Sequence, residues 1–146
     1  MIDPRGPRFA AAITTIVLGA VLVTANPWLL AAQVAVFAAA SAGGLGASPY
    51  GRLYARLVRP RLGPPSELED ERPPRFAQAV GLAFSVTGLA GLLAGLTGLF
   101  YVVTAAAFAA AFLNAAFGFC LGCEIYLVAR RITSRTSASQ PEVTAP

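Results

Sequence analysis

Residues 76–123 decide the fold class, and they read FAQAVGLAFSVTGLAGLLAGLTGLFYVVTAAAFAAAFLNAAFGFCLGC. This stretch contains no charged side chain, and Gly95-Leu96-Thr97-Gly98 near its middle is a turn signal. A helix that crosses a bilayer needs about 20 apolar residues. The stretch therefore predicts two transmembrane helices joined by a tight turn, over residues 76–94 and 99–119.

The N-terminal part of the chain contains a second charge-free stretch, residues 9–51. Its turn signal is Asn26-Pro27-Trp28, so we predict transmembrane helices over residues 8–25 and 28–47. Apolar residues make up 56% of the 146-residue chain and charged residues 12%. The four segments also lack the polar face, repeating roughly every 3.6 residues, of a soluble amphipathic helix. The sequence therefore predicts an all-α membrane protein with four transmembrane helices.

The orientation follows from the basic residues, which are all arginines. They precede the first predicted helix, lie between the second and the third, or follow the fourth: Arg5, Arg8, Arg52, Arg56, Arg59, Arg61, Arg72, Arg75, Arg130, Arg131 and Arg135. Because basic residues concentrate in cytoplasmic loops, both termini and the central loop are predicted to be cytoplasmic. We expect Trp28, Phe100 and Tyr101 to form an aromatic belt at the opposite interface.

The chain contains an internal repeat. Residues 3–10, DPRGPRFA, align with residues 70–77, DERPPRFA, and six of the eight positions are identical. A second set of residues, Gly46, Ser48, Leu53 and Tyr54, aligns with Gly118, Cys120, Ile125 and Tyr126. We predict two tandem helical hairpins, residues 3–60 and 70–131. Each holds an even number of spans, so their pseudo-twofold axis should follow the membrane normal.

The repeats are predicted to form a single transmembrane domain, residues 1–135. Residues 136–146 are small and polar and are predicted to form a disordered cytoplasmic tail. Within the spans, Gln33 and Asn114 are polar, and we expect them to form hydrogen bonds between helices. The lining of a small polar cavity is the alternative for both.

Each repeat begins with an acidic residue, prolines and two arginines. Proline suits the first turn of a helix, and Asp3 and Asp70 are expected to pair with arginines or to cap the helix. The four arginines at this cytoplasmic rim are Arg5, Arg8, Arg72 and Arg75. The first interpretation is a fixed helix start anchored at the lipid headgroups. The alternative is an arginine ring that binds a phosphorylated or lipid ligand.

The composition excludes several kinds of site. The chain has no histidine, which excludes a Ser-His-Asp triad, a His-Cys dyad and a histidine-ligated zinc site. Its two cysteines cannot by themselves complete a tetrahedral zinc site, although a dimer with both pairs on its axis would supply four thiolates. We therefore expect no metal and no cofactor, and no nucleic-acid partner because no soluble basic module is present.

The pattern that carries chemistry is Cys120-Leu121-Gly122-Cys123, at the cytoplasmic end of the fourth predicted helix. Its aligned residue Ser48 precedes proline, which predicts a helix N-cap, so by analogy Cys120 should cap a helix running to Arg131. A thiol at a helix N-terminus within C-x-x-C tends to have a lowered pKa. The alternative is an unbroken fourth helix, which would disfavour the thiolate at its C-terminal end. A structural disulfide is not expected in a reducing cytosol.

Four patterns together carry a family resemblance: residues 2–9 (IDPRGPRF), 48–51 (SPYG), 69–78 (EDERPPRFAQ) and 118–123 (GFCLGC). They resemble domain-of-unknown-function family 4395, small bacterial integral membrane proteins, over about residues 2–131. The resemblance implies a multi-pass protein of the bacterial inner (plasma) membrane. Such proteins are often encoded near thioredoxin-like or rhodanese-like proteins, which implies a soluble partner of that kind beside the lipid bilayer.

The leading hypothesis is a membrane component of thiol redox or sulfur-transfer metabolism. Cys120 would be the attacking or sulfur-accepting catalytic thiol and Cys123 the resolving one. A non-enzymatic scaffold or assembly subunit is the alternative, and a small transporter the third choice, disfavoured because no intramembrane charge marks a path. Whether the protein is an enzyme, and whether it forms a homo-oligomer, stay open at this point.

Overall fold

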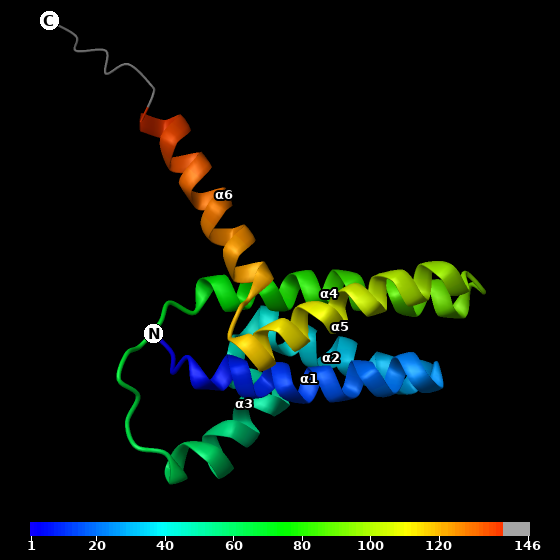
Figure 1. Ribbon diagram of the computed structural model, residues 1–146, viewed down its shortest axis with the longest axis horizontal. Helices are drawn as coiled ribbons and strands as arrows, with labels where there is room; N and C mark the ends of the chain where they lie inside the picture. The colour runs from blue at the N-terminus through cyan, green and yellow to red at the C-terminus, as the bar shows by residue number, and fades with distance from the viewer. Residues whose placement is uncertain (139–146) are drawn as a thin grey trace, which may run out of the picture.

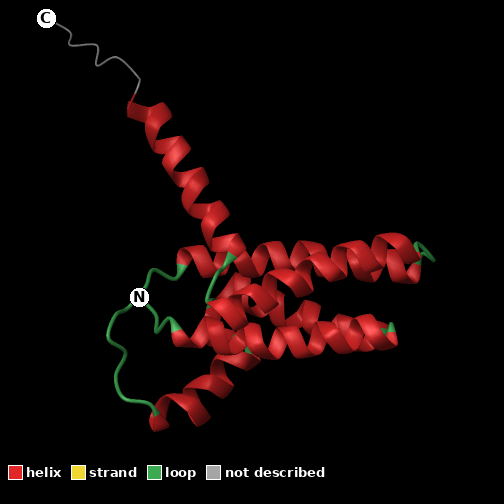
Figure 2. Ribbon diagram, viewed as in Figure 1, coloured by secondary structure: helices red, strands yellow, loops and turns green. Residues whose placement is uncertain are grey.

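The computed structural model describes residues 1–138, and every regular element in that range is a helix or a helical turn (Figure 2). Four helices lie side by side and form a bundle (Figure 1). They are α1 (Arg5–Thr24), α2 (Pro27–Gly43), α4 (Arg72–Leu93) and α5 (Thr97–Phe117). The prediction of an all-α fold is therefore confirmed.

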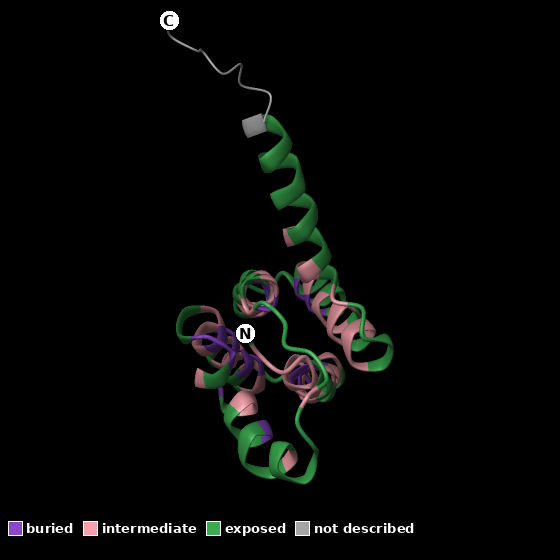
Figure 3. Cartoon of the chain, turned by 90° about the vertical axis from the view of Figure 1, so that its left-hand side faces the viewer, coloured by how far each residue is buried: buried purple, intermediate pink, exposed green. Residues whose placement is uncertain are grey.

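Two further helices leave the bundle at the end where the N-terminus lies (Figure 1). The first is α3 (Pro49–Leu53), which continues as a π-helical turn, Tyr54–Val58, and a 3-10 turn, Arg59–Arg61. A 3-10 turn, Leu45–Ala47, connects it to α2. The second is α6 (Leu121–Ala138), most of whose residues are exposed (Figure 3).

Three helices, α1, α4 and α5, are long and apolar enough to cross a membrane. The fourth helix of the bundle, α2, is also apolar but shorter. It ends at Gly43, whereas the sequence predicted a helix to residue 47, because Gly44 adopts a positive φ of 90° and turns the chain out of the helix.

The two turns at the far end of the bundle lie at the residues that the sequence indicated. The side-chain oxygen of Asn26 accepts hydrogen bonds from the backbone N–H groups of Trp28 and Leu29, at 2.9 and 3.3 Å, and so caps α2. Pro27 occupies the first helical position. Between α4 and α5, Gly95 has a φ of 78°, which only glycine adopts without strain.

The core lies near these turns and contains Leu18, Val21, Leu30 and Phe100, all fully buried. Phe100 was predicted at the membrane interface, and that prediction is wrong. The tight turn folds the start of α5 back onto α4, so Phe100 points inward to the core contributed by α1 and α2. Trp28, by contrast, is 82% exposed and Tyr101 42% exposed.

The C-terminal boundary also differs from the prediction. Helix α6 continues beyond Arg131 and Arg135 to Ala138, so residues 136–138 are helical although they were assigned to the tail. In the C-terminal half of α6, the Ser134 hydroxyl donates to the Arg130 carbonyl one turn earlier, at 2.9 Å. The rest of the predicted tail, residues 139–146, lies outside the described residues.

Candidate functional site: a dithiol at the start of α6

The chain breaks between α5 and α6, immediately before the cysteines. Helix α5 ends at Phe117, and Gly118 adopts a left-handed conformation with a φ of 68°. Its N–H donates to the Asn114 carbonyl at 3.0 Å, which terminates the helix as C-terminal glycines commonly do. Helix α6 then begins at Leu121. The predicted break is confirmed, and the alternative of an unbroken fourth helix is wrong.

Cys120 caps the new helix. The backbone N–H of Cys123 donates to Cys120 Sγ at 3.3 Å, and the N–H of Glu124 donates to the Cys120 carbonyl at 3.0 Å. Ser48 does the same for α3, where its Oγ accepts from the Gly51 N–H at 3.0 Å. The predicted analogy between Ser48 and Cys120 therefore holds in detail.

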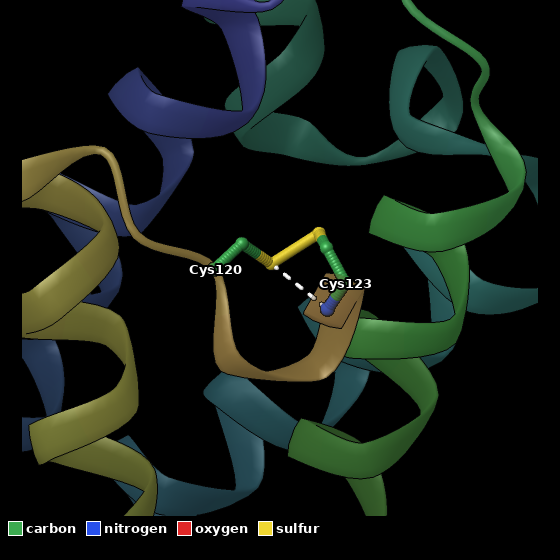
Figure 4. Close-up of a disulfide and its surroundings, with 2 residues drawn as sticks. All are labelled: Cys120 and Cys123. Carbon is green, nitrogen blue, oxygen red and sulfur yellow. Dashed lines mark hydrogen bonds between the residues drawn. A yellow bond between two sulfur atoms is a disulfide. The ribbon is translucent and has the colours of Figure 1, made fainter. Parts of the chain in front are cut away.

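The two cysteines form a disulfide, with their Cα atoms 5.2 Å apart (Figure 4). This separation lies inside the range of about 4.4–6.8 Å that disulfides require. A structural disulfide was not expected from the sequence, because a cytoplasmic position implies a reducing compartment. The geometry explains the bond: an N-cap residue and the third residue of the helix lie next to each other in space. The pair can therefore be oxidised without moving the backbone.

The first turn of α6 packs directly on the backbone of α4. A Cβ atom at Gly122 would lie only 2.6 Å from the Cβ of Ala77 and 2.7 Å from its Cα. No side chain larger than hydrogen fits at residue 122, since ordinary contacts are 3.4–4 Å. The close approach holds the dithiol against α4, and it was missed in the sequence.

Two of the rim arginines pair with the acidic residues that precede them. Arg5 bonds both carboxylate oxygens of Asp3, at 2.8–3.2 Å, and Arg72 does the same with Asp70, at 2.7–3.2 Å. The hydrogen bonds from Arg5 hold the pKa of Asp3 well below its usual range. Those from Arg72 lower the pKa of Asp70 to about 2. The predicted pairing is confirmed.

The other two rim arginines cap helices of the opposite hairpin. Arg8, on α1, donates to the carbonyls of Ala115 and Ala116 at the end of α5, at 3.3 and 3.4 Å. Arg75, on α4, donates to the carbonyls of Ser41 and Ala42 at the end of α2, at 2.8–3.2 Å. The C-terminal carbonyls of a helix carry partial negative charge, so each guanidinium is well placed there. All four rim arginines thus have partners within the protein.

Two cavities meet at Cys120. The end cavity, about 600 Å³, lies at the rim and is lined by both cysteines together with Arg5, Arg8 and Glu124, among others. The inner cavity, about 260 Å³, lies between α1, α2, α4, α5 and the start of α6 and is lined mostly by apolar residues. Cys120 is on the wall of both cavities, whereas Cys123 lines only the end cavity. Cys120 therefore lies between the two cavities.

A family profile described as Domain of unknown function (DUF4395) matches residues 2–131, which include the rim arginines and both cysteines. The chain belongs to this family. No curated protein and no solved structure matches the chain. The geometry of the DUF4395 chain itself therefore supplies the functional argument.

The polar residues inside the DUF4395 bundle differ in their bonding. Gln33 is fully buried, donates to Thr14 Oγ1 at 3.4 Å and accepts from the Tyr50 hydroxyl at 2.7 Å, so its predicted interhelical bonding is confirmed. Burial raises the pKa of Tyr50, which keeps this donor protonated. The Asn114 amide lines both cavities and has no hydrogen-bond partner within residues 1–138. For Asn114 the first expectation was wrong, and cavity lining was the better interpretation.

Three contacts that hold the rim of this DUF4395 domain were not predicted. The Tyr54 hydroxyl donates to the Asp3 carboxylate at 2.8 Å, and Glu71 accepts from the Leu45 N–H at 2.9 Å. Ile2 and Glu69 exchange two backbone hydrogen bonds, at 2.8 and 2.9 Å. For the first of these, the only signal in the sequence was the alignment of Tyr54 with Tyr126. Nothing local in the sequence signals the other two.

Proposed function

We propose that this protein is a bacterial membrane protein that exchanges thiols and disulfides with a soluble partner through Cys120 and Cys123. The observation that carries the proposal is the position of Cys120. Its sulfur accepts the Cys123 N–H at the N-terminus of α6, and the residue lines the end cavity. Partial positive charge at a helix N-terminus stabilises a thiolate, which is the reactive form in exchange. A thioredoxin-like or rhodanese-like protein has the chemistry expected of the partner.

The exchange follows from the geometry. A partner thiolate attacks Cys120 Sγ, the Cys120–Cys123 bond breaks, and Cys123 leaves as a thiolate. The second partner thiolate then attacks the partner's sulfur in the mixed disulfide and releases Cys120. The partner has lost two electrons and become a disulfide, while the membrane protein holds a dithiol. In the reverse direction, Cys120 attacks the partner and Cys123 resolves the mixed disulfide.

The same proposal includes four membrane crossings with both termini in the cytoplasm. All the arginines belong to the first turns of α1 and α4, to α3 and the turns after it, or to α6. These segments gather at one end of the bundle (Figure 1), and the turns at the far end carry no charge. This asymmetry supports the orientation given by the positive-inside rule. Helix α2 would cross the membrane together with the residues that follow it, 44–47.

Matching contacts in the two halves support the tandem repeat and its pseudo-twofold axis. The rings of Phe9 and Tyr54 lie 5.6 Å apart at 48°, and those of Phe76 and Tyr126 lie 5.6 Å apart at 47°. Three other features occur once in each half: an Asp–Arg pair, an N-cap on α3 or α6, and an arginine that caps a helix of the other hairpin. We call these last contacts, from Arg8 to α5 and from Arg75 to α2, the crossed arginine caps. Unrelated hairpins would have no reason to share this set.

Trapping a mixed disulfide tests the redox function. Protein with Cys123→Ser, reduced in vesicles and exposed to glutathione disulfide, should form a stable mixed disulfide at Cys120, because no resolving thiol remains. Protein with Cys120→Ser should form the adduct at Cys123 at least tenfold more slowly, because that thiol lacks the N-cap position. Mass spectrometry of the intact protein measures both rates.

A matched control places a thiol where the proposal assigns no reactivity. The exposed residue Ser134, in the C-terminal half of α6, serves in the variant Ser134→Cys on a chain with both native cysteines replaced by serine. Its adduct rate gives the baseline of an ordinary exposed thiol. If Cys120 reacts no faster than this baseline, the redox proposal fails and the scaffold hypothesis takes its place.

The topology has its own test. Reporters inserted near Ser66 and fused after Pro146 should both read cytoplasmic. A single cysteine at Trp28, on the cysteine-free chain, should react with a membrane-impermeant maleimide added from outside the cell. An outside reading at either reporter would contradict four crossings.

A further inference from the structure

We infer that the inner cavity binds the head group of a quinone, which takes up the electrons that the Cys120–Cys123 pair receives from its partner. The inference rests on the proposed thiol exchange and names the membrane-side reactant of the same site. A dithiol that oxidises one partner after another must itself be reoxidised. The soluble partner reacts with Cys120 from the end cavity. The inner cavity also borders Cys120, so a second reactant can bind there.

The size and lining of the inner cavity suit a single ring system. Its volume of about 260 Å³ lies just below the roughly 300–1,000 Å³ found for small-molecule pockets. Its walls are alanines of α1, α4 and α5 together with aromatic and aliphatic side chains, and two of its lining residues, Phe84 and Ala106, are exposed at the side of the bundle. A lipid-soluble ring can therefore enter from the bilayer, with its tail left outside.

Two amide side chains give the cavity its polarity. Gln78 on α4 and Asn114 on α5 both line it, and neither side chain has a hydrogen-bond partner within the described part of the chain. Ionised groups are absent from this lining. Neutral donors on the adjacent helices α4 and α5 can bond the carbonyl oxygens of a quinone, whereas an anionic or cationic ligand would have no counter-charge. The polar chemistry therefore selects a neutral carbonyl compound.

The electron balance is complete with a quinone. The two S–H bonds of the dithiol break and one S–S bond forms between Cys120 and Cys123. The two electrons and two protons pass to the quinone, which leaves as a hydroquinone. Cys120 is the cysteine on the wall of the inner cavity, so we assign the reaction with the ring to its sulfur. Cys123, already bonded to Cys120 in the oxidised form, closes the disulfide without a change in backbone position.

The test uses full-length protein in phospholipid vesicles, reduced and held under argon. The probe is a benzoquinone with a decyl tail and no free ring position, so that thiols cannot simply add to the ring. We expect one quinone to be consumed, by ultraviolet absorbance, for each Cys120–Cys123 disulfide formed, by alkylation and mass spectrometry. The rate should saturate with quinone concentration, as binding to a site requires.

Variants of α5 make the test specific. Ala110→Leu fills the inner cavity, whereas Ala109→Leu adds the same side chain at the next, exposed position, outside the lining. We expect Ala110→Leu to slow quinone reduction at least tenfold and to leave exchange with glutathione disulfide unchanged, while Ala109→Leu changes neither. Asn114→Ala should raise the half-saturating quinone concentration about tenfold, the effect of one lost hydrogen bond.

The outcomes separate this inference from the proposed function. If the dithiol reduces glutathione disulfide but does not reduce the quinone, the quinone site is refuted and the exchange function stands. Equal quinone rates in the Ala109 and Ala110 variants also refute the site, because the reaction would then not pass through the cavity. If the dithiol reacts with neither reagent, both proposals fall.

Discussion

Replacing Gly122 by alanine should loosen the attachment of the dithiol to α4. The new Cβ would lie 2.6 Å from the Ala77 Cβ and 2.7 Å from its Cα, about 0.8 Å closer than the shortest ordinary contact of 3.4 Å. One of the two atoms is backbone, so no side chain can rotate away. Overpacking of this kind costs about 1–3 kcal/mol. It acts against the gain of about 0.5–1 kcal/mol that alanine brings to a helix.

A second glycine cancels the helix-propensity gain. Gly98 is the second residue of α5, as Gly122 is the second residue of α6, and a Cβ at Gly98 would meet nothing within 4 Å. Gly98→Ala should therefore stabilise the protein slightly. The difference between the two variants isolates the contact with Ala77, and we expect it to be about 1–3 kcal/mol. Thermal unfolding in detergent, followed by far-ultraviolet circular dichroism, measures it.

A redox readout accompanies the stability measurement. If α6 lifts from α4, the Cys120–Cys123 pair is held less firmly, and its equilibrium with glutathione should shift in Gly122→Ala and not in Gly98→Ala. Adding Ala77→Gly to Gly122→Ala removes one of the two close contacts and should restore part of the stability. Equal stabilities for the two alanine variants would refute the close packing of α6 on α4.

Two more predictions concern the rim and the buried amide. The carboxylate of Asp3 is 8% exposed, and its hydrogen bonds from Arg5 lower its pKa in the folded protein. Its contribution to the free energy of unfolding is therefore complete above about pH 4, the pKa in the unfolded chain, and is lost as the pH falls through the lowered pKa. Asp3→Asn should lower the free energy of unfolding by about 1–3 kcal/mol at pH 7 and make stability depend less on pH in the acid range. The same change at the exposed Asp70 should have a much smaller effect. Thermal unfolding from pH 7 to 3 measures both variants. Tyr50→Phe leaves the buried Gln33 oxygen without its donor and should cost about 1–3 kcal/mol by the same assay; an unchanged melting temperature would contradict the bond.

Much of the fold could be predicted from the sequence because the signals are local. The absence of charge marks the helices, and Asn26 marks a turn because its side chain caps the next helix within three residues. The alignment of Cys120 with Ser48 predicted the break before α6, since an N-cap also depends only on its nearest neighbours. Such features need no knowledge of the packed structure.

The remaining features depend on segments far apart in the chain. The burial of Phe100 requires α1 and α2 to be in place, and its apolar, aromatic side chain is equally suited to an interface. The requirement for glycine at residue 122 comes from Ala77 on another helix. Arg8 and Arg75 could be placed at the rim from sequence, but the carbonyls that they contact lie across the bundle. The two cavities follow from the same packing.

The crossed arginine caps bear on how the chain acquires its structure during synthesis. Helix α1 packs along α5 and α2 along α4, and each hairpin needs an arginine of the other to cover its last carbonyls. When the first hairpin leaves the ribosome, its main neighbours have not yet been made. Arg75 can reach α2 only after the central loop has been synthesised, and Arg8 must wait for the end of α5. Neither hairpin can therefore complete its helix ends until residues of the other have been made.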